Sequence, residues 1–321
     1  MTEDPAAVSV GVLGLGLIGG SLLRRLVAIP SAASSALGWD ADPSTRTAAA
    51  DAGLVVAEGT AELAARCDIL VLAVPLPALP DVLDELAGAA VRPMLTDVTS
   101  VKGPVLELAA ERDLSIIAGH PMAGTAESGF AASSADLLAV ASWVLCVEDD
   151  TDLRDWLTVA RLVIALGAQV VPTTAARHDA AVARISHLPH LLASALAQQA
   201  SDGLTQRLAA GSFSDGTRVA ATREELTAAM CSANAPAVVA ALDETLQLLA
   251  HARQLLVDDA DLRPWFAAGR LSRAQLTAPR PHLRRRVPTA GLSPAELRTL
   301  LRQIGDVGTI TAIAPDGELT C

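Results

Sequence analysis

Short apolar runs alternate with amphipathic stretches along the first half of the chain. Runs typical of strands lie at residues 8–14, 35–40, 68–74, 93–98, 114–119, 142–147 and 168–173. Apolar positions with helical spacing lie between them, at residues 19–28, 43–52, 104–112 and 152–166. Strands that are apolar throughout and alternate with helices predict a parallel sheet covered on both faces.

The second half has a different pattern. From Ala176 to about Ala268 strand patterns are almost absent, and long Ala/Leu-rich stretches have helical spacing, several of them apolar all round. We therefore expect an all-α helical domain with one face buried by a partner subunit. A Pro/Arg-rich tail follows, with a short helix at 293–305 and a weak strand at 309–314. The predicted domains are 1–173, 174–280 and the tail 281–321.

Composition narrows the class of protein. A chain of 321 residues fits two domains. A formal net charge of −12 argues against nucleic acid or an anionic membrane as partner, because both require a basic face. The one basic run, 284–286, is expected to be a solvated tail.

Cysteine usage and the N-terminus bear on localisation. The four cysteines are far apart and form no CxxC pair, which suits a reducing compartment and gives no zinc signature. The acidic N-terminus lacks a signal sequence, and no apolar run reaches the roughly 18 residues of a membrane helix. We expect a soluble, cytoplasmic protein.

A glycine motif follows the first predicted strand. Gly14, Gly16 and Gly19 have G-x-G-x-x-G spacing, between an apolar strand and the helix predicted at 19–28, and we expect Leu17 and Ile18 of this loop to bind the cofactor with them. Such glycines allow a tight turn, a close approach to a pyrophosphate and close helix–strand packing, while the helix N-terminus attracts the phosphates. The alternative is a plain glycine-rich turn. The context favours a dinucleotide-binding loop on a Rossmann-type, doubly wound parallel sheet.

The ends of the next two strands indicate the kind of dinucleotide. Asp40 ends the second strand, and a carboxylate there accepts hydrogen bonds from a ribose 2′-OH and repels a 2′-phosphate. The pattern thus favours NAD over NADP, although Arg46 could serve a 2′-phosphate. Val74 and Pro75 end the third strand, where they either flank the nicotinamide ribose or form a plain turn.

Two further strand ends carry polar residues. Ser100 follows the strand at 93–98 and His120 follows the run at 114–119, so we expect both at the cofactor's edge of the sheet. A histidine suits the role of general base, and a serine beside it can orient its ring. Ser100 lies outside a G-x-S-x-G elbow, which argues against a serine hydrolase. Lys102, the chain's one lysine, is expected at the surface.

A second cluster of histidines lies in the helical half. His178, His187 and His190 fall within one stretch, and Pro189 should kink the helix that carries the last two. A metal site, structural histidines and an anion site are the alternatives; the absence of HExxH and of nearby cysteines argues against metal.

Arg218 follows a Gly/Ser turn predicted at residues 211–214. Its guanidinium is suited to bind a substrate carboxylate through two hydrogen bonds. A surface pair with Asp215 is the alternative.

The motifs GLGLIGG, DVTSVKG, GHPMAGTAESG, HDAAVARISHLPH and DGTRVA occur in this order. Over about residues 8–270 the chain resembles the prephenate/arogenate dehydrogenase family. The resemblance implies oxidative decarboxylation of prephenate to 4-hydroxyphenylpyruvate with NAD+, in tyrosine biosynthesis, by a homodimer. It also implies roles for single residues. His120 takes a proton from the ring hydroxyl, Ser100 orients His120, and the substrate contacts are Arg218, His190, His187, Ser100 and Thr125.

Three features depart from the family pattern. Ala126 stands where many members have a glutamate, with Glu127 one step later, and Thr227 stands where many have a tryptophan. The tail is too short for an ordinary regulatory domain of the ACT type. Three alternatives stay open: an arogenate or amino-deoxyprephenate dehydrogenase, a hydroxyacid dehydrogenase, and a catalytically silent nucleotide-binding regulator.

Overall fold

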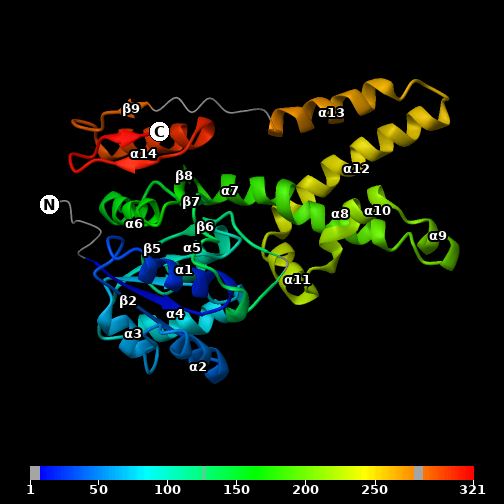
Figure 1. Cartoon of the computed structure of the whole chain (residues 1–321). Helices are drawn as coiled ribbons and strands as arrows, with labels where there is room; N and C mark the ends of the chain where they lie inside the picture. The colour runs from blue at the N-terminus through cyan, green and yellow to red at the C-terminus, as the bar shows by residue number, and fades with distance from the viewer. Residues whose placement is uncertain (1–7, 126, 278–284) are drawn as a thin grey trace. The chain divides into compact units, whose positions relative to one another are not determined.

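The computed structural model describes residues 8–125, 127–277 and 285–321. The chain forms two compact units (Figure 1). The first unit consists of Met1–Val182, Thr222–Ala233 and Arg285–Cys321, and the second of Ala183–Ala221 and Asn234–Arg284. The domain boundaries near 173 and 280 rest on the sequence pattern alone and stay predictions.

A five-stranded parallel sheet forms the centre of the first unit (Figure 1). Its strands, in the order β2-β1-β3-β4-β5, are β1 (Ser9–Leu13), β2 (Ser35–Trp39), β3 (Ile69–Leu72), β4 (Met94–Asp97) and β5 (Ile116–Ile117). The helices between them are α1 (Leu17–Ala28), α2 (Pro43–Asp51), α3 (Thr60–Arg66), the 3₁₀ turn η2 (Leu76–Ala78), α4 (Leu79–Ala87) and α5 (Gly103–Ala110). The predicted doubly wound parallel sheet is confirmed.

Alternate side chains of these strands build two separate cores. Val12 and Val71 pack in one core, with α1 and α6 (Leu153–Ala165). Leu13 and Leu72 pack in the other, with α3, α4 and α5. Each such fully buried side chain contributes roughly 1.5–3 kcal/mol. Burial on both faces explains why the strands read as continuous apolar runs.

The sequence-based prediction of one strand over 114–119 is wrong. The run divides at Ala118: Ile116–Ile117 pairs in the parallel sheet, whereas β6 (Gly119–Pro121) pairs antiparallel with β7 (Ser142–Cys146). β8 (Gln169–Thr173) completes this second sheet, in the order β6-β7-β8. The chain can change sheets at Gly119, because a Cβ there would lie 2.8 Å from the Asp97 carbonyl oxygen.

Residues 285–321 pack onto the first unit. The segment contains β9 (Arg286–Val287), α14 (Pro294–Val307), β10 (Ala312–Ile313) and β11 (Leu319–Thr320). Leu301 and Ile304 of α14 join the first core, and Ile310 forms a bridge with Val170 of β8. The predicted helix and weak strand are confirmed.

The basic run is not a purely solvated tail. The backbones of Arg285 and Cys321 exchange two hydrogen bonds of 2.9 Å, and Arg286 pairs with Thr320 in the β9–β11 ladder. The third member of the run, Arg284, lies outside the described residues.

The second unit is helical throughout its described part, as predicted. Its elements are the π turn η4 (Ala183–His187), α8 (Leu188–Ala197), α9 (Gly203–Leu208), α10 (Gly211–Thr217), the 3₁₀ turn η5 (Arg218–Ala221), α12 (Ala235–Val257) and α13 (Arg263–Thr277). The Gly/Ser turn predicted before Arg218 is instead helix α10. Gly216 of α10 packs so closely on α8 that a Cβ would lie 3.0 Å from a Leu196 methyl.

Two helices of the first unit come from the helical half of the sequence, α7 (Ala175–Val182) and α11 (Glu224–Ala233). In the described ranges no single helix has the length and apolarity needed to cross a membrane. Within the same ranges one bent pair of helices, α11 and α12, passes such a test when the two are taken together.

Candidate functional site

The residues singled out in the first unit lie along one edge of the parallel sheet. Gly14, Asp40, Val74 and Ser100 come directly after the carboxyl ends of β1, β2, β3 and β4 or in the loop beyond. His120 lies three residues beyond the end of β5. The chain leaves β1 toward β2 on one side and β3 lies on the other, so this edge contains the switch point at which such sheets bind ligands.

The glycine loop has the geometry of a phosphate-binding turn. Gly14 has a φ of +94°, a conformation that favours glycine. A Cβ on Gly19 would lie 1.9 Å from the Gly14 carbonyl oxygen, so α1 can approach the turn only without one. A Cβ on Gly16 would have no atom of the chain within 4 Å. The protein itself therefore does not require glycine at position 16, whereas a ligand close to the backbone would.

Leu17 and Ile18 form the first turn of α1, whose N-cap residue is Gly16. No side chain caps this helix end. Its first N–H groups and the positive end of the helix dipole therefore suit the phosphates of a dinucleotide.

Asp40 connects the second strand to this loop. Its Oδ2 accepts from the backbone N–H of Leu15 at 2.6 Å, and its Oδ1 accepts from the N–H of Asp42 at 2.9 Å. Each carboxylate oxygen can accept a second hydrogen bond, so the side chain retains capacity for a ribose hydroxyl. Arg46 bonds the carbonyl oxygens of Asp40 and Ala41 at 2.7 and 3.0 Å, which holds a guanidinium beside the same strand end.

Val74 and Pro75 lie where the chain leaves β3. Pro75 is the N-cap residue of η2 and is exposed. The structure thus places a short helical turn at this strand end. Contact of these two residues with a cofactor stays a prediction.

Lys102 is fully buried, and its expected place at the surface is wrong. Its ammonium forms an ion pair with Asp97 and donates to Thr99 Oγ1 at 3.0 Å and to the Gly119 carbonyl at 2.6 Å. Asp97 Oδ1 accepts from the Gly119 N–H at 2.9 Å. The two peptide groups of Gly119, immediately before His120, are therefore held by one buried ion pair.

A second polar chain runs through His120 itself. Its Nδ1 lies 2.9 Å from Nε2 of His178, on α7, and the two rings meet edge to face. His178 Nδ1 lies 2.8 Å from Asp179 Oδ1. Both Asp179 oxygens also accept backbone N–H groups, from Lys102 at 2.9 Å and Gly103 at 2.8 Å. His178 and Asp179 are buried and His120 is partly exposed, so this series of hydrogen-bonded side chains runs from the interior to the surface.

Hydrogen bonding outweighs burial in setting the charge of Asp179. Burial raises the pKa of this carboxyl, but bonds from His178 and from the N–H groups of Gly103 and Lys102 lower it. The net pKa lies below the ordinary value, so Asp179 is a carboxylate at neutral pH.

Sequence reasoning named His178 without a role and missed Asp179. The local signal is the pair His-Asp on one helix, but the partner His120 is 58 positions away. At Nδ1 the ring of His120 meets His178. Ser100 lies in the loop between β4 and α5, and its proposed role stays a prediction, as does that of the exposed Thr125, whose hydroxyl donates to the Glu127 carbonyl at 3.3 Å.

Three predicted substrate contacts lie in the second unit. His190 Nδ1 lies 3.1 Å from the carbonyl oxygen of Val219, the residue after Arg218, so His190 lies against the backbone next to Arg218. Arg218 is exposed and, in the described part of the chain, forms no ion pair with Asp215. His187 is fully buried and lies 3.2 Å from the side-chain amide of Asn234, so its assignment to substrate binding stays a prediction.

Two of the three departures from the family pattern, Ala126 and Thr227, add little to the description of the site. Ala126 lies outside the described residues. Thr227 lies in α11 and donates to the carbonyl of Arg223 at 3.1 Å.

Across the described ranges, no three His, Cys, Asp or Glu side chains cluster as metal ligands.

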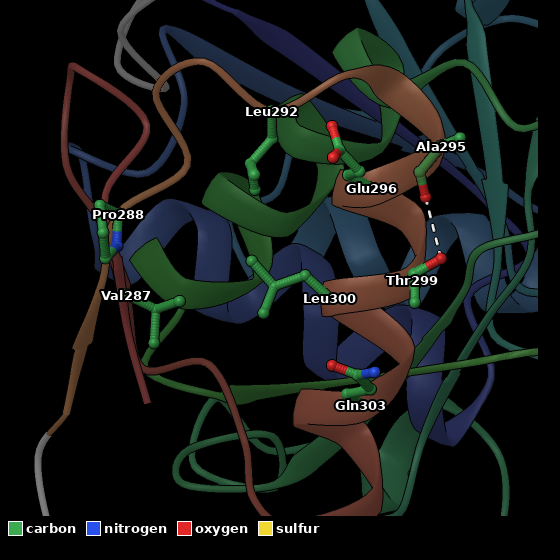
Figure 2. Close-up of a pocket in the computed structure, with 8 residues that line it drawn as sticks. All are labelled: Val287, Pro288, Leu292, Ala295, Glu296, Thr299, Leu300 and Gln303. Carbon is green, nitrogen blue, oxygen red and sulfur yellow. Dashed lines mark hydrogen bonds between the residues drawn. The ribbon is translucent and has the colours of Figure 1, made fainter.

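A surface pocket of about 480 Å³ lies beside α14, and none of its lining residues belongs to the edge described above (Figure 2). Its lining is Val287, Pro288, Leu292, Ala295, Glu296, Thr299, Leu300 and Gln303. Its one charged group, Glu296, already accepts from the N–H and hydroxyl of Ser293 in a capping box. This pocket has no set of convergent polar groups and is a poorer candidate than the sheet edge.

The fold and the glycine loop place the first unit in the class of nucleotide-binding α/β domains. Two sequence profiles agree: "Prephenate dehydrogenase, nucleotide-binding domain" matches residues 31–172, and "Prephenate dehydrogenase, dimerization domain" matches residues 174–266. The chain belongs to the prephenate dehydrogenase family.

Curated relatives agree with this family. The chain is 33% identical over 225 residues to the prephenate dehydrogenase of Lactococcus lactis, covering 65% of this chain and 60% of that protein. It is 30% identical over 244 residues to the cyclohexadienyl dehydrogenase of Zymomonas mobilis, covering 73% and 83%. The match thus spans only about 60% of the length of the first of these relatives.

Solved structures show the same fold. A candidate prephenate dehydrogenase from Corynebacterium glutamicum is 37% identical, with a TM-score of 0.86 over 94% of this chain and 98% of that one. The arogenate dehydrogenase of Synechocystis is 31% identical, with a TM-score of 0.68 over 84% and 97%.

Proposed function

We propose that this protein is an NAD-dependent dehydrogenase that converts prephenate to 4-hydroxyphenylpyruvate by oxidative decarboxylation, in tyrosine biosynthesis. One observation carries the proposal: in a chain of this family, His120 lies past the strand edge that carries the glycine loop, and its ring is held by a second imidazole.

The residues at the sheet edge fit a dinucleotide. The open space at Gly16 and the uncapped N-terminus of α1 suit a pyrophosphate, and Asp40 suits an unphosphorylated ribose. When bound, the nicotinamide supplies the hydride acceptor for the substrate's ring carbon. The carboxylate of Asp40 favours NAD, because it would repel a 2′-phosphate.

His120 supplies the base. Loss of hydride from the carbon that bears the hydroxyl turns this group into a carbonyl, and its proton passes to His120. Loss of CO₂ then returns an electron pair to the ring, and the ring oxygen takes the proton back as the ring becomes aromatic. A positioned base contributes about 10²–10⁴-fold, which is roughly 3–5 kcal/mol.

Arg218 and His190 are the proposed binding groups for the acidic substrate. Arg218 presents an exposed guanidinium, and His190 is adjacent to it through Val219. A guanidinium binds a carboxylate through two parallel hydrogen bonds and fixes its orientation. Orientation matters here because aromatisation supplies much of the driving force, which leaves positioning as the protein's main task.

The deciding experiment is an assay of nicotinamide reduction with prephenate and arogenate side by side, each with NAD+ and NADP+. We expect the highest kcat/KM with prephenate and NAD+. No reduction with either substrate would overturn the proposal and would favour a silent nucleotide-binding protein.

Arogenate is the second candidate substrate, because a Synechocystis relative of 31% identity is an arogenate dehydrogenase. The two substrates share the ring and differ only in a side-chain carbonyl or amine, so the chemistry at His120 is the same. A higher kcat/KM with arogenate would establish this alternative.

We also propose that the protein acts as a homodimer through its helical half. The match to a dimerization domain supports this, and so do large apolar side chains exposed on α12 and α13. These side chains are Val239, Leu246, Leu248, Leu249, Leu256, Val257, Phe266, Leu271 and Leu276. Sedimentation of the full chain tests this, and a monomer at micromolar concentration would contradict it.

A further inference from the structure

The hydrogen-bonded chain Asp179–His178–His120 begins at a group whose protonation state is defined. Asp179 receives the first two N–H groups at the start of α5, from Lys102 and Gly103. The positive end of that helix and these two donors stabilise a carboxylate. An ionised carboxylate only accepts hydrogen bonds, so His178 Nδ1, 2.8 Å away, carries a proton and donates it.

The proton on His178 determines the tautomer of the next ring. A neutral imidazole has one N–H, so a His178 protonated at Nδ1 presents a lone pair at Nε2. His120 Nδ1 lies 2.9 Å from that lone pair and must donate to it. The lone pair of His120 is then on Nε2, the ring nitrogen farther from His178.

We propose that His178 and Asp179 are positioning residues that hold His120 in the tautomer whose Nε2 accepts the substrate's proton. The proposal rests on the proposed function, because it explains how His120 is prepared as the base. When the substrate O–H bond breaks, a new N–H bond forms on His120 Nε2. The resulting positive charge is stabilised through His178 by the carboxylate of Asp179. The same proton returns to the ring oxygen after CO₂ leaves. The relay formed by Asp179, His178 and His120 therefore ends each turnover in its starting protonation state.

Other charged groups near the two imidazoles are already engaged. Asp97 and Lys102 neutralise each other beneath the Gly119 peptide groups. Glu148 accepts from the Ala175 N–H at the start of α7 at 2.6 Å. Burial raises the pKa of the Cys146 thiol on β7, so it is neutral. Asp179 is thus the carboxylate that acts directly on His178.

The first test measures the tautomer without any turnover. Nitrogen NMR of the ¹⁵N-histidine-labelled full chain distinguishes protonated from unprotonated ring nitrogens, and His120→Asn identifies the signals of His120. We expect His120 protonated at Nδ1 and unprotonated at Nε2 in the wild type. If His178 is doubly protonated, its Nε2 donates to His120 Nδ1, and the proton of His120 then lies on Nε2. A His120 protonated at Nε2 overturns the proposal.

The second test measures turnover in two replacements of His178. His178→Leu removes the acceptor of the His120 N–H and should lower kcat by roughly 10²- to 10⁴-fold. This range covers the known effects of losing a general base and of holding a histidine in the wrong tautomer. KM should change less than about threefold. In His178→Gln an amide oxygen can reach the place of Nε2 and still accept from His120, so a part of kcat should return. Equal activity of the two variants would contradict the tautomer role. His251→Gln is the control, because His251 is exposed on α12 and should leave kcat unchanged.

The third test is the pH profile of Asp179→Asn. Loss of the carboxylate removes the charge that favours a protonated imidazole pair, so the acid limb of kcat should move to lower pH. A lower plateau with an unmoved acid limb would show that Asp179 acts only in packing. A wild type that reduces no NAD+ with either substrate would refute the proposed function, whereas an active wild type with an unshifted limb refutes the relay alone.

Discussion

The ammonium nitrogen of Lys102 lies 2.6 Å from the carbonyl oxygen of Gly119, the residue that precedes His120. The same ammonium pairs with Asp97, whose other oxygen accepts the Gly119 N–H at 2.9 Å. Both side chains of this pair have 0% exposure. A buried ion pair thus fixes the backbone from which the proposed base projects, where the chain passes from one sheet to the other.

Replacing Lys102 with Met should therefore destabilise the protein and misplace His120. The substitution leaves the charge of Asp97 buried and uncompensated, which costs about 3–5 kcal/mol. Urea unfolding measures this loss, and kcat should fall in the fraction that stays folded. The double variant Asp97→Asn/Lys102→Met removes both charges and should recover part of the stability. A single variant as stable as the wild type would contradict a structural role for the pair.

Lys102 also shows what the sequence could and could not predict. The glycine loop and the strand that precedes it were predictable, because spacing and periodicity are local. The partner of Lys102 lies five residues upstream in the same motif, but nothing local shows that both side chains turn inward. His178 could not be assigned either, since its contact with His120 joins positions 58 residues apart. The error over 114–119 has a similar cause, because an apolar run does not show where a chain changes sheets.

Two glycines of the same loop should respond differently to alanine. Gly19→Ala would place a Cβ 1.9 Å from the Gly14 carbonyl oxygen, so Tm should fall and cofactor binding should be lost with it. Gly16→Ala meets no atom of the protein within 4 Å, so Tm should be unchanged while NAD+ binds at least about tenfold more weakly, a loss of about 1.4 kcal/mol. Thermal unfolding and calorimetric titration with NAD+ separate the two effects. Full NAD+ affinity in Gly16→Ala would place the pyrophosphate elsewhere.

Asp40→Asn should weaken the preference for NAD+. The substitution removes the charge that repels a 2′-phosphate and leaves the guanidinium of Arg46 beside the same strand end. The ratio of kcat/KM for NAD+ to that for NADP+ should fall by about tenfold or more, or about 1.4 kcal/mol. Asp51→Asn, at the exposed end of α2, is the matched control and should leave the ratio unchanged. An unchanged ratio in Asp40→Asn would mean that Asp40 only holds the loop through Leu15.

His120→Asn should lower kcat by about 10²–10⁴-fold while NAD+ binding persists, because the amide cannot take up a proton at neutral pH. Turnover assays and a calorimetric titration with NAD+ measure the two properties independently. Turnover within threefold of the wild type would mean that another group, such as Ser100 or solvent, accepts the proton.

Arg218→Ala should raise KM for the acidic substrate far more than it lowers kcat. A guanidinium that binds a substrate carboxylate contributes about 1.5–3 kcal/mol, so a rise of roughly 10- to 100-fold is expected. The fold should not change, because Arg218 is exposed at the end of α10.

Arg223→Ala is the matched control: Arg223 is also exposed, and its acidic partner is Glu225 at 3.8 Å. If both variants raise KM equally, the effect comes from the general loss of positive charge, and the contact assigned to Arg218 is wrong. If only Arg218→Ala does so, the guanidinium recognises the substrate, and KM for NAD+ should be unchanged in the same variant.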